Sequence, residues 1–233
     1  MDAKIDAPNA VGEHDAGLDL AHADAAPFTV ASLKAGYQRG EIKPADVVRA
    51  VYERIRQAER PDVWINVRPE AEAVALAERA LADTPLYGIP FAVKDNIDVA
   101  GLPTTAACPA YAYTPAESAV SVARLEAAGA ICIGKTNLDQ FATGLCGVRS
   151  PYGACGSAYL PDIIAGGSSS GSAAAVGLGE VAFTLGTDTG GSGRIPAAFN
   201  NVVGLKPTIG AISTRGLVPN CRTLDCVSVF AQT

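Results

Sequence analysis

Two clusters of glycine and serine, at residues 166–172 and 190–193, are the part of this sequence best suited to chemistry. Glycine lets the backbone approach a ligand closely and adopt positive φ, while serine supplies hydroxyl groups. Between the clusters, small residues at 173–178 predict a helix and apolar residues at 181–185 predict a strand, which argues against a flexible linker. A phosphate-binding loop is disfavoured because neither GxxxxGK[ST] nor GxGxxG after a strand is present. The remaining interpretation is that serine hydroxyl groups of these clusters take part in catalysis.

A serine nucleophile needs a base, and the sequence narrows the choice. The only histidines, His14 and His22, lie in a polar N-terminal stretch, so a Ser-His-Asp triad would lack its base in the folded part of the chain. A desolvated neutral lysine is the usual substitute. Lys94, Lys135 and Lys206 each follow an apolar strand candidate. Spacing alone does not choose among the three.

Three stretches resemble the three motifs of the amidase signature family: GIPFAVKDNID around Lys94, GGSSSGSAAA around Ser168 and TDTGGSGRIPA around Ser192. The separation of the two serines, 192 − 168 = 24, also fits the family pattern. The resemblance runs from about Phe28 to the last residue. It implies a Ser-cisSer-Lys triad in which Ser192 is the nucleophile, Ser168 is the bridge and Lys94 is the base. It also implies that the peptide bond from Gly167 to Ser168 is cis.

Within this family, the likeness is greatest to the allophanate hydrolase branch. It rests on NIDVAGLPTTAACPAYAYTP, IGKTNLDQFATGLCGVRSPYG and FNNVVGLKPTIGAISTRGLVPNCRTLDCVSVFA. Most of the family carries Gly-Gly after the paired serines, whereas this chain has Ser170 and Gly171. That departure resembles the same branch.

The turn before Ser192 predicts an oxyanion hole, because its glycines allow successive backbone N–H groups to point at one spot. The expected donors are the amides of Thr189, Gly190, Gly191 and Ser192. Asp188 and Arg194 flank the turn, and we expect them to support it through an ion pair or backbone contacts. Arg194 has a second interpretation, as a group that binds an anionic substrate.

On the substrate side, the resemblance implies three residues, Ala142, Thr143 and Ser169. Ala142 and Thr143 occupy the position where the family places a backbone carbonyl near the substrate amide. Ser169 and Ser170 also compete with Ser168 for the bridging role on chemistry alone, and only the family spacing selects Ser168. Lys94 has a structural alternative too, a salt bridge to a neighbouring aspartate, Asp95 or Asp98. As a base it must be neutral, so burial has to lower its pKa by several units. Lys135 and Lys206 are expected to serve in packing or capping.

The resemblance implies a hydrolase that converts allophanate, a small-molecule amide, to ammonia and carbon dioxide in urea-related nitrogen catabolism. It implies no organic cofactor and no metal. Two other functions stay open. One is the A subunit of a tRNA-dependent amidotransferase, and the other is a non-catalytic fragment or subunit that needs a partner. A homodimer or larger assembly is expected for the full-length form.

Composition excludes several other classes. The 233 residues are 48% hydrophobic and 18% charged, enough for a substantial core. A net charge of −6 without Lys/Arg runs argues against nucleic acid as a partner. Six cysteines without a CxxC pair argue against zinc and favour a reducing compartment. Neither a signal peptide nor a membrane-spanning run is evident, so we expect a cytoplasmic protein with no membrane partner.

Hydrophobic periodicity predicts an α/β fold. The expected helices are 28–37, one from Pro44 through Ile55, 69–82, 118–128, 137–145 and 173–178, and the expected strands are 64–67, 86–93, 130–133, 181–185 and 227–230. The strand-helix-strand order favours largely parallel pairing with right-handed crossovers. The resemblance implies an α/β/α sandwich around a central mixed sheet. We expect residues 1–26 to be a flexible tail and 27–233 to be the N-terminal half of an amidase domain that opens with helices at 28–82.

Overall fold

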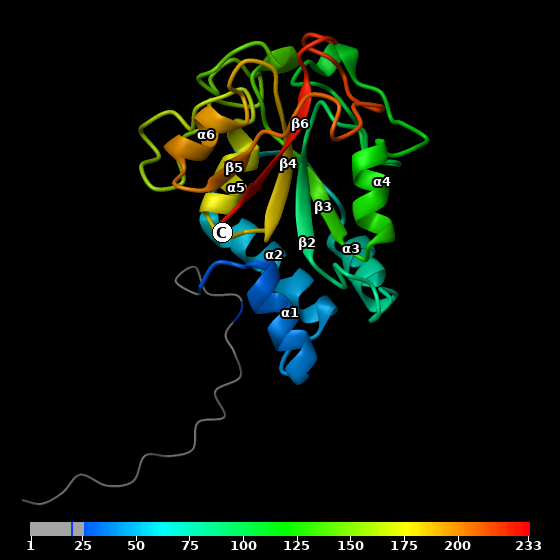
Figure 1. Ribbon diagram of the computed structural model, residues 1–233. Helices are drawn as coiled ribbons and strands as arrows, with labels where there is room; N and C mark the ends of the chain where they lie inside the picture. The colour runs from blue at the N-terminus through cyan, green and yellow to red at the C-terminus, as the bar shows by residue number, and fades with distance from the viewer. Residues whose placement is uncertain (1–19, 21–25) are drawn as a thin grey trace, which may run out of the picture.

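The computed structural model describes residue 20 and residues 26–233 (Figure 1). Most of the expected N-terminal tail, including both histidines, therefore lies outside the described residues. Within the described residues, no helix is long and apolar enough to cross a membrane.

A six-stranded mixed sheet forms the centre of the fold, with strand order β1-β3-β2-β4-β6-β5. The strands are β1 (Trp64–Val67), β2 (Pro90–Lys94), β3 (Ile131–Thr136), β4 (Phe183–Asp188), β5 (Val203–Leu205) and β6 (Cys226–Ala231). The central strand β2 pairs in parallel with both β3 and β4. The remaining pairs, β1 with β3, β4 with β6 and β5 with β6, are antiparallel. The predicted α/β class with a mixed sheet is confirmed, and its parallel part lies at the centre.

Helices lie on both sides of this sheet (Figure 1). They are α1 (Val30–Arg39), α2 (Pro44–Ala58), α3 (Glu70–Glu78), α4 (Val120–Ala127), α5 (Ser170–Gly177) and α6 (Arg194–Phe199), with short 3-10 turns at Pro109–Tyr111 and Gln140–Ala142. The chain passes from β2 through α4 to β3, and then from β3 through α5 back across β2 to β4. These two crossovers run in opposite directions along the sheet. Right-handed connections therefore place α4 and α5 on opposite faces, as Figure 1 shows.

Small residues let α5 approach the sheet closely. The helix reads SGSAAAVG, and it packs against β2, β3, β4 and β6. A Cβ added at Gly171 would lie 2.3 Å from the carbonyl oxygen of Val63, so this position has no room for a side chain. This close approach brings the serines at the start of α5 to the ends of the central strands.

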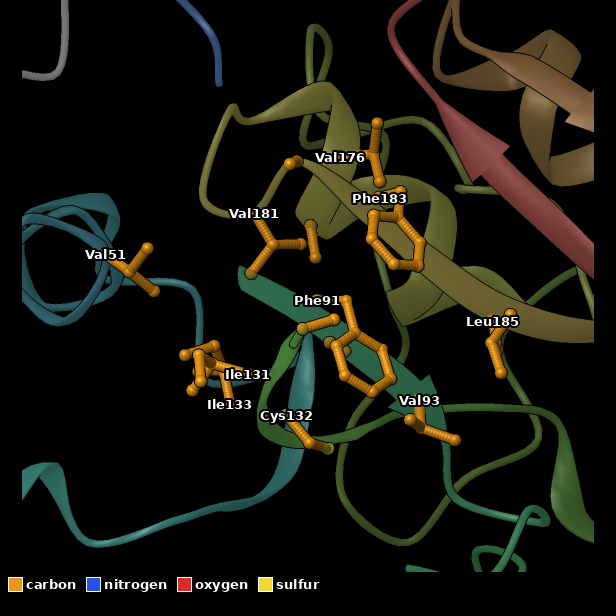
Figure 2. Packing of buried hydrophobic residues seen from close by; sticks show 14 of the residues in the cluster. Val51, Phe91, Val93, Ile131, Cys132, Ile133, Val176, Val181, Phe183 and Leu185 are labelled. Carbon is orange, nitrogen blue, oxygen red and sulfur yellow. The ribbon is translucent and has the colours of Figure 1, made fainter. Parts of the chain in front are cut away.

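The hydrophobic core fills the space around β2 and β4 (Figure 2). Phe91 and Phe183 are partners in the parallel register, and their rings stack with centroids 5.3 Å apart. Such a pair contributes about 0.5–1.5 kcal/mol beyond the area that it buries. Val51 of α2 and Val176 of α5 belong to the same cluster. The core thus fixes the parallel strands whose ends carry the site.

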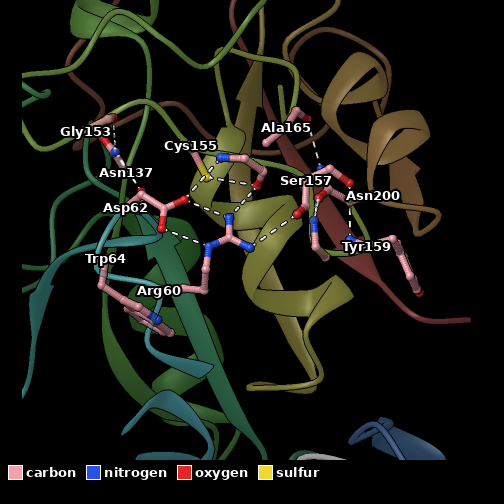
Figure 3. A network of polar contacts seen from close by, with 12 residues as sticks. Arg60, Asp62, Trp64, Asn137, Gly153, Cys155, Ser157, Tyr159, Ala165 and Asn200 are labelled. Atoms are coloured by element: carbon pink, nitrogen blue, oxygen red, sulfur yellow. Dashed lines mark hydrogen bonds and ion pairs between the residues drawn. The ribbon is translucent and has the colours of Figure 1, made fainter. Parts of the chain in front are cut away.

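The loop that leads into the first serine cluster is tied to the body of the protein (Figure 3). Side chains from three other segments donate hydrogen bonds to carbonyl groups of this loop: Arg60 to Gly156 and Ser157, Asn137 to Gly153, and Asn200 to Ala165. Arg60 also forms an ion pair of 2.7 Å with Asp62. The loop at 146–165 is therefore irregular in secondary structure but held at several points.

The element boundaries differ from the sequence predictions in several places. The strand expected at 86–93 begins only at Pro90, and the helix expected at 69–82 is the shorter α3. The helix expected over 137–145 was wrong. That segment forms a single 3-10 turn, because Phe141 and Ala142 both adopt positive φ, 51° and 56°. A right-handed helix cannot continue through such residues. The short helix α6 was not predicted.

Candidate active site

The site residues meet where the parallel strands end. Lys94 is the last residue of β2 and Asp188 is the last residue of β4. The serines at 168–170 lie at the start of α5, which packs against both strands. In open α/β sheets, ligands bind outside the carboxyl ends of the strands. Parallel pairing and a close helix therefore bring three separate motifs to one edge.

Lys94 is buried with no exposed surface, and its amine lies between two hydroxyl groups. Its Nζ is 2.8 Å from Ser168 Oγ and 2.7 Å from Thr187 Oγ1. Burial lowers the pKa of Lys94 to about 7, although the carboxylates of Asp139, Asp188 and Asp225 act in the opposite direction. An amine with this pKa is largely able to accept a proton near neutrality.

The two other lysines considered from the sequence are placed differently. Lys135 is also fully buried, but its Nζ forms an ion pair of 2.9 Å with Asp95 and a hydrogen bond of 2.9 Å to Thr104. The amine of Lys135 is thus engaged by a carboxylate and a hydroxyl, and no hydrogen bond within residues 26–233 joins it to the serine cluster. Lys206 donates to the carbonyl of its neighbour Pro207. The salt bridge considered for Lys94 is thus formed by Lys135 instead.

The peptide bond between Gly167 and Ser168 is cis, as the resemblance implies. The hydroxyl of Ser168 faces Lys94, and its carbonyl accepts a hydrogen bond of 3.1 Å from the amide of Asp139. Ser168 is fully buried. The geometry therefore singles out Ser168 as the serine that contacts the lysine, where chemistry alone left three candidates.

The hydroxyl of Ser169 contacts the backbone of β4. Its hydroxyl donates to the carbonyl of Thr187 at 3.0 Å and accepts from the amide of the same residue at 3.3 Å. The side chain is fully buried. Both hydrogen-bonding functions of this hydroxyl are thus used to join α5 to β4. The hydroxyl therefore makes a structural contact, and the assignment of Ser169 to the substrate stays a prediction.

Ser192 lies in a turn whose backbone is held by the side chain of Asp188. The Asp188 carboxylate accepts hydrogen bonds from the amides of Gly191 and Gly193, and Arg194 contacts it with two nitrogens at 2.9 and 3.0 Å. Burial by itself would raise the pKa of Asp188, but Arg194 and these amides together hold that pKa below its ordinary value. The expected ion pair and backbone contacts around the turn are present.

Ser192 is buried, with 3% of its surface exposed. Among residues 26–233, no hydrogen bond joins it to Ser168 or to any other side chain. The structure therefore brings Lys94 and Ser168 into direct contact and places Ser192 at the same strand edge, four residues beyond the end of β4.

One of the predicted oxyanion-hole donors makes a hydrogen bond within the turn. The amide of Gly191 donates to Asp188 Oδ1 at 2.8 Å, so this N–H is not free to bind an oxyanion. Within the described part of the chain, the amides of Thr189, Gly190 and Ser192 have no acceptor. They remain the candidate donors. Gly191 serves the turn instead through its backbone conformation, with φ at 133°.

A second turn, at residues 141–143, carries the remaining substrate-side candidates. Ala142 is buried and Thr143 is exposed. The three amides of this turn donate to the carbonyls of Ala106, Asp139 and Gln140. The carbonyl of Thr143 accepts from Arg149 at 3.3 Å. Among the hydrogen bonds of the described chain, none ends on the carbonyl of Ala142. The expectation that a backbone carbonyl here meets a substrate amide stays a prediction.

Sequence reasoning missed three residues of this site. Thr187 contacts the lysine amine directly. Asp139 accepts from the amides of Gly147 and Arg149, which holds the loop beside the cis peptide. Asp225 accepts from the Thr189 hydroxyl at 2.5 Å. Thr187 follows an apolar strand beside the glycine turn, which was an available signal, but nothing in the local sequence marks Asp139 or Asp225.

The described residues do not form a set of metal ligands. Among the described residues, no group of three or more His, Cys, Asp or Glu side chains lies close enough together to hold a metal ion. The carboxylates around the site are instead engaged by backbone amides, hydroxyls and Arg194.

The fold and the site together define an α/β protein with a buried serine–lysine pair beside a glycine-rich turn. The sequence model of the family described as Amidase matches residues 46–233. The chain is 55% identical over 182 residues to a urea amidolyase of Lachancea kluyveri, and 47% identical over 199 residues to the A subunit of a glutamyl-tRNA(Gln) amidotransferase of Streptococcus thermophilus. The chain therefore belongs to the amidase family.

Solved structures show the same likeness. An allophanate hydrolase of Kluyveromyces lactis superimposes with a TM-score of 0.79 at 47% identity, over 88% of this chain and 34% of that one. A peptide amidase of Stenotrophomonas maltophilia gives a TM-score of 0.83 at 33% identity, over 91% and 46% of the two chains. The matches to the two curated relatives cover 76% and 83% of this chain, but only 10% and 41% of the relatives.

Proposed function

We propose that this chain carries the catalytic centre of an amide hydrolase, with Ser192 as nucleophile and the Lys94–Ser168 pair as its proton relay. The observation that carries the proposal is the contact of 2.8 Å between Lys94 Nζ and Ser168 Oγ in a fully buried environment. Burial lowers the pKa of Lys94 to about 7. An amine that is neutral near pH 7 can take a serine proton, which a charged lysine cannot do.

The proposed reaction begins when Ser192 Oγ attacks the carbonyl carbon of the amide. The proton of Ser192 passes to Ser168 while the proton of Ser168 passes to Lys94. The carbonyl oxygen, now negatively charged, is bound by the free amides of the glycine turn. When the C–N bond breaks, the relay returns a proton to the departing nitrogen and ammonia leaves. Water then attacks the acyl carbon while the same relay takes a proton from that water. The bond from the acyl carbon to Ser192 Oγ breaks, the acid product leaves, and the relay returns the proton to Ser192 Oγ.

Allophanate is the substrate that we propose. The urea amidolyase and allophanate hydrolase relatives support it, at 55% and 47% identity. With one water, allophanic acid would give two molecules of ammonia and two of carbon dioxide, because the product of the first cleavage decomposes. The role in urea-related nitrogen catabolism belongs to the same proposal.

A second candidate is the A subunit of a tRNA-dependent amidotransferase. The identity of 47% to such a subunit over 83% of this chain favours it. The two candidates share the serine–lysine chemistry and differ in substrate and in the need for partner subunits. A non-catalytic role stays open for a chain that spans only part of its relatives.

The test is ammonia release by the full-length protein, with allophanate and glutamine as alternative substrates. We expect release from allophanate and none from glutamine alone. Ser192→Ala should abolish release and also abolish acylation, which intact mass spectrometry of the quenched enzyme can detect at Ser192. Parental rates in Ser192→Ala would show that the nucleophile is wrong, and selective release from glutamine would favour the amidotransferase.

Two further parts of the proposal concern the protein as a whole. All six cysteines are free thiols, which suits a reducing compartment such as the cytoplasm. The assignment of residues 27–233 to the N-terminal half of an amidase domain, and a homodimer or larger assembly, stay predictions.

A further inference from the structure

Asp225 connects the nucleophile turn to a segment that is distant from it in sequence. It immediately precedes β6, whose first residue pairs with Asp188 at the end of β4. The carboxylate of Asp225 is buried and accepts a hydrogen bond of 2.5 Å from the hydroxyl of Thr189. It also accepts from the backbone amides of Asn220 and Cys221 at 3.1 Å. One carboxylate thus binds both the turn at 189–193 and the start of its own loop.

Asn220 continues this connection to the other side of the site. Its side-chain nitrogen donates to Thr143 Oγ1 at 2.9 Å and to the carbonyl of Phe141 at 3.2 Å. Residues 220–225, which we call the bracket, therefore contact both turns that face the candidate substrate position. The bracket is internally tight, because the amides of Leu224 and Asp225 both donate to the carbonyl of Cys221.

The turn at 141–143 needs such support. Phe141 and Ala142 are consecutive non-glycine residues with φ of 51° and 56°. A non-glycine residue in this left-handed region is strained and persists only where its surroundings fix it. Part of that fixation comes from the hydrogen bonds of Asn220. The same turn carries the carbonyl of Ala142, which has no hydrogen-bond donor within the described residues.

We propose that Asp225 and Asn220 are positioning residues, and that the bracket sets the separation between the Thr189–Ser192 turn and the Phe141–Thr143 turn. This inference rests on the proposed function, in which the first turn carries the nucleophile and the second faces the substrate amide. Asp225 acts through the Thr189 hydroxyl and Asn220 through Thr143. Neither side chain touches the reacting atoms.

The charge of Asp225 makes the pH dependence of kcat/KM a test of this role, because a variant that only destabilises the fold would not shift that dependence. Three carboxylates act on the Lys94 amine, those of Asp139, Asp188 and Asp225, and each raises its pKa against the effect of burial. Asp188 is neutralised by Arg194, whereas no ion pair within residues 26–233 ends on Asp225. Removing the charge of Asp225 should therefore favour the neutral amine and move the acidic limb of kcat/KM to lower pH.

The experiment compares three variants of the full-length protein with a matched control. Thr189→Val keeps the backbone amide and the shape but removes the donor to Asp225, and Asn220→Ala removes the contacts to the second turn. Asp225→Asn keeps the size and removes the charge. Arg222→Ala, within the bracket but on an exposed side chain, is the control. Steady-state hydrolysis of allophanate is measured across pH, and thermal unfolding verifies that each variant is folded.

We expect Thr189→Val to lower kcat about tenfold to a hundredfold with little change in KM, since small displacements at a reacting centre have effects of this size. Asn220→Ala should mainly raise KM. Asp225→Asn should lower kcat and shift the acidic limb to lower pH, and Arg222→Ala should match the parent. The inference is overturned if Thr189→Val and Asn220→Ala keep parental kcat and KM, or if the acidic limb of Asp225→Asn does not move. Failure of the proposed function is detected separately. If Ser192 is not the nucleophile, Ser192→Ala will keep the parental rate, whatever the other variants do.

Discussion

Replacement of Lys94 by arginine is the sharpest test of the proposed chemistry. Arginine keeps the positive charge and much of the length, but its guanidinium cannot act as a base. The amine of Lys94 is fully buried, and its hydrogen bonds within the described residues are to the hydroxyl groups of Ser168 and Thr187. We expect Lys94→Arg to be nearly as inactive as Lys94→Ala, because no other described group is placed to take the serine proton.

The magnitude follows from the pKa of Lys94. Burial lowers this pKa from 10.5 to about 7. At pH 7, about half of the amine is then neutral, against roughly 0.03% for an unperturbed lysine, so burial raises the competent fraction by about three orders of magnitude. Loss of the base should cost at least a comparable factor in kcat/KM. In the parent, kcat/KM should rise with pH and level off above about 7, as a property of the coupled Lys94–Ser168 pair.

The assay is a pH–rate series of ammonia release for the parent, Lys94→Arg and Lys94→Ala. Lys206→Ala serves as the control, because it replaces another of the three candidate lysines, one whose amine donates to the carbonyl of Pro207. A Lys94→Arg enzyme that keeps most of its activity, with the same acidic limb as the parent, would refute the assignment of Lys94 as the base.

Three other substitutions test the surroundings of the site. Glu180 is buried, and burial raises its pKa to about 8. The folded state therefore binds the carboxyl proton of Glu180 more tightly than the unfolded state, and the free energy of unfolding falls as pH rises from about 4.5 to about 8. Glu180→Gln should remove this pH-dependent loss, which is on the order of a few kcal/mol. Urea unfolding across pH measures it. Lys135→Ala should destabilise the fold by about 3–5 kcal/mol by leaving Asp95 unpaired, and replacing both by apolar residues should restore most of it. Ser169→Ala should lower the unfolding midpoint with little change in KM, whereas a large rise in KM would support the assignment of Ser169 to the substrate.

Local sequence patterns predicted most of the elements, because they depend on neighbours in the chain. Pro44 at the first turn of α2 and the apolar stripe at Val47, Val48 and Val51 are short-range signals, and the helix begins where they indicate. The strands that end at Lys94 and Asp188 are buried along their whole length. The apolar residues in the first part of each strand are the signal that predicted them, and burial along the whole length is typical of central strands.

Elsewhere, long-range contacts overrode the local pattern. Residues 137–145 have composition compatible with a helix, but the Asp139 side chain bonds to the amides of Gly147 and Arg149, and Asn220 bonds to the turn at 141–143. These contacts join segments up to 79 positions apart. No short window of sequence contains them, so propensity alone predicted the wrong conformation.

By itself, the sequence determined the kind of chemistry. It placed serines and glycines in two clusters, put lysines after apolar strands and kept histidine out of the region from 26 onward. The tertiary structure decided which side chains meet. Only the parallel pairing of β2 and β4, with α5 packed across them, brings Ser168 to Lys94 and gives Asp95 to Lys135. The physical reason is desolvation: burial lowers the pKa of Lys94, and the segments that bury it are distant in the sequence.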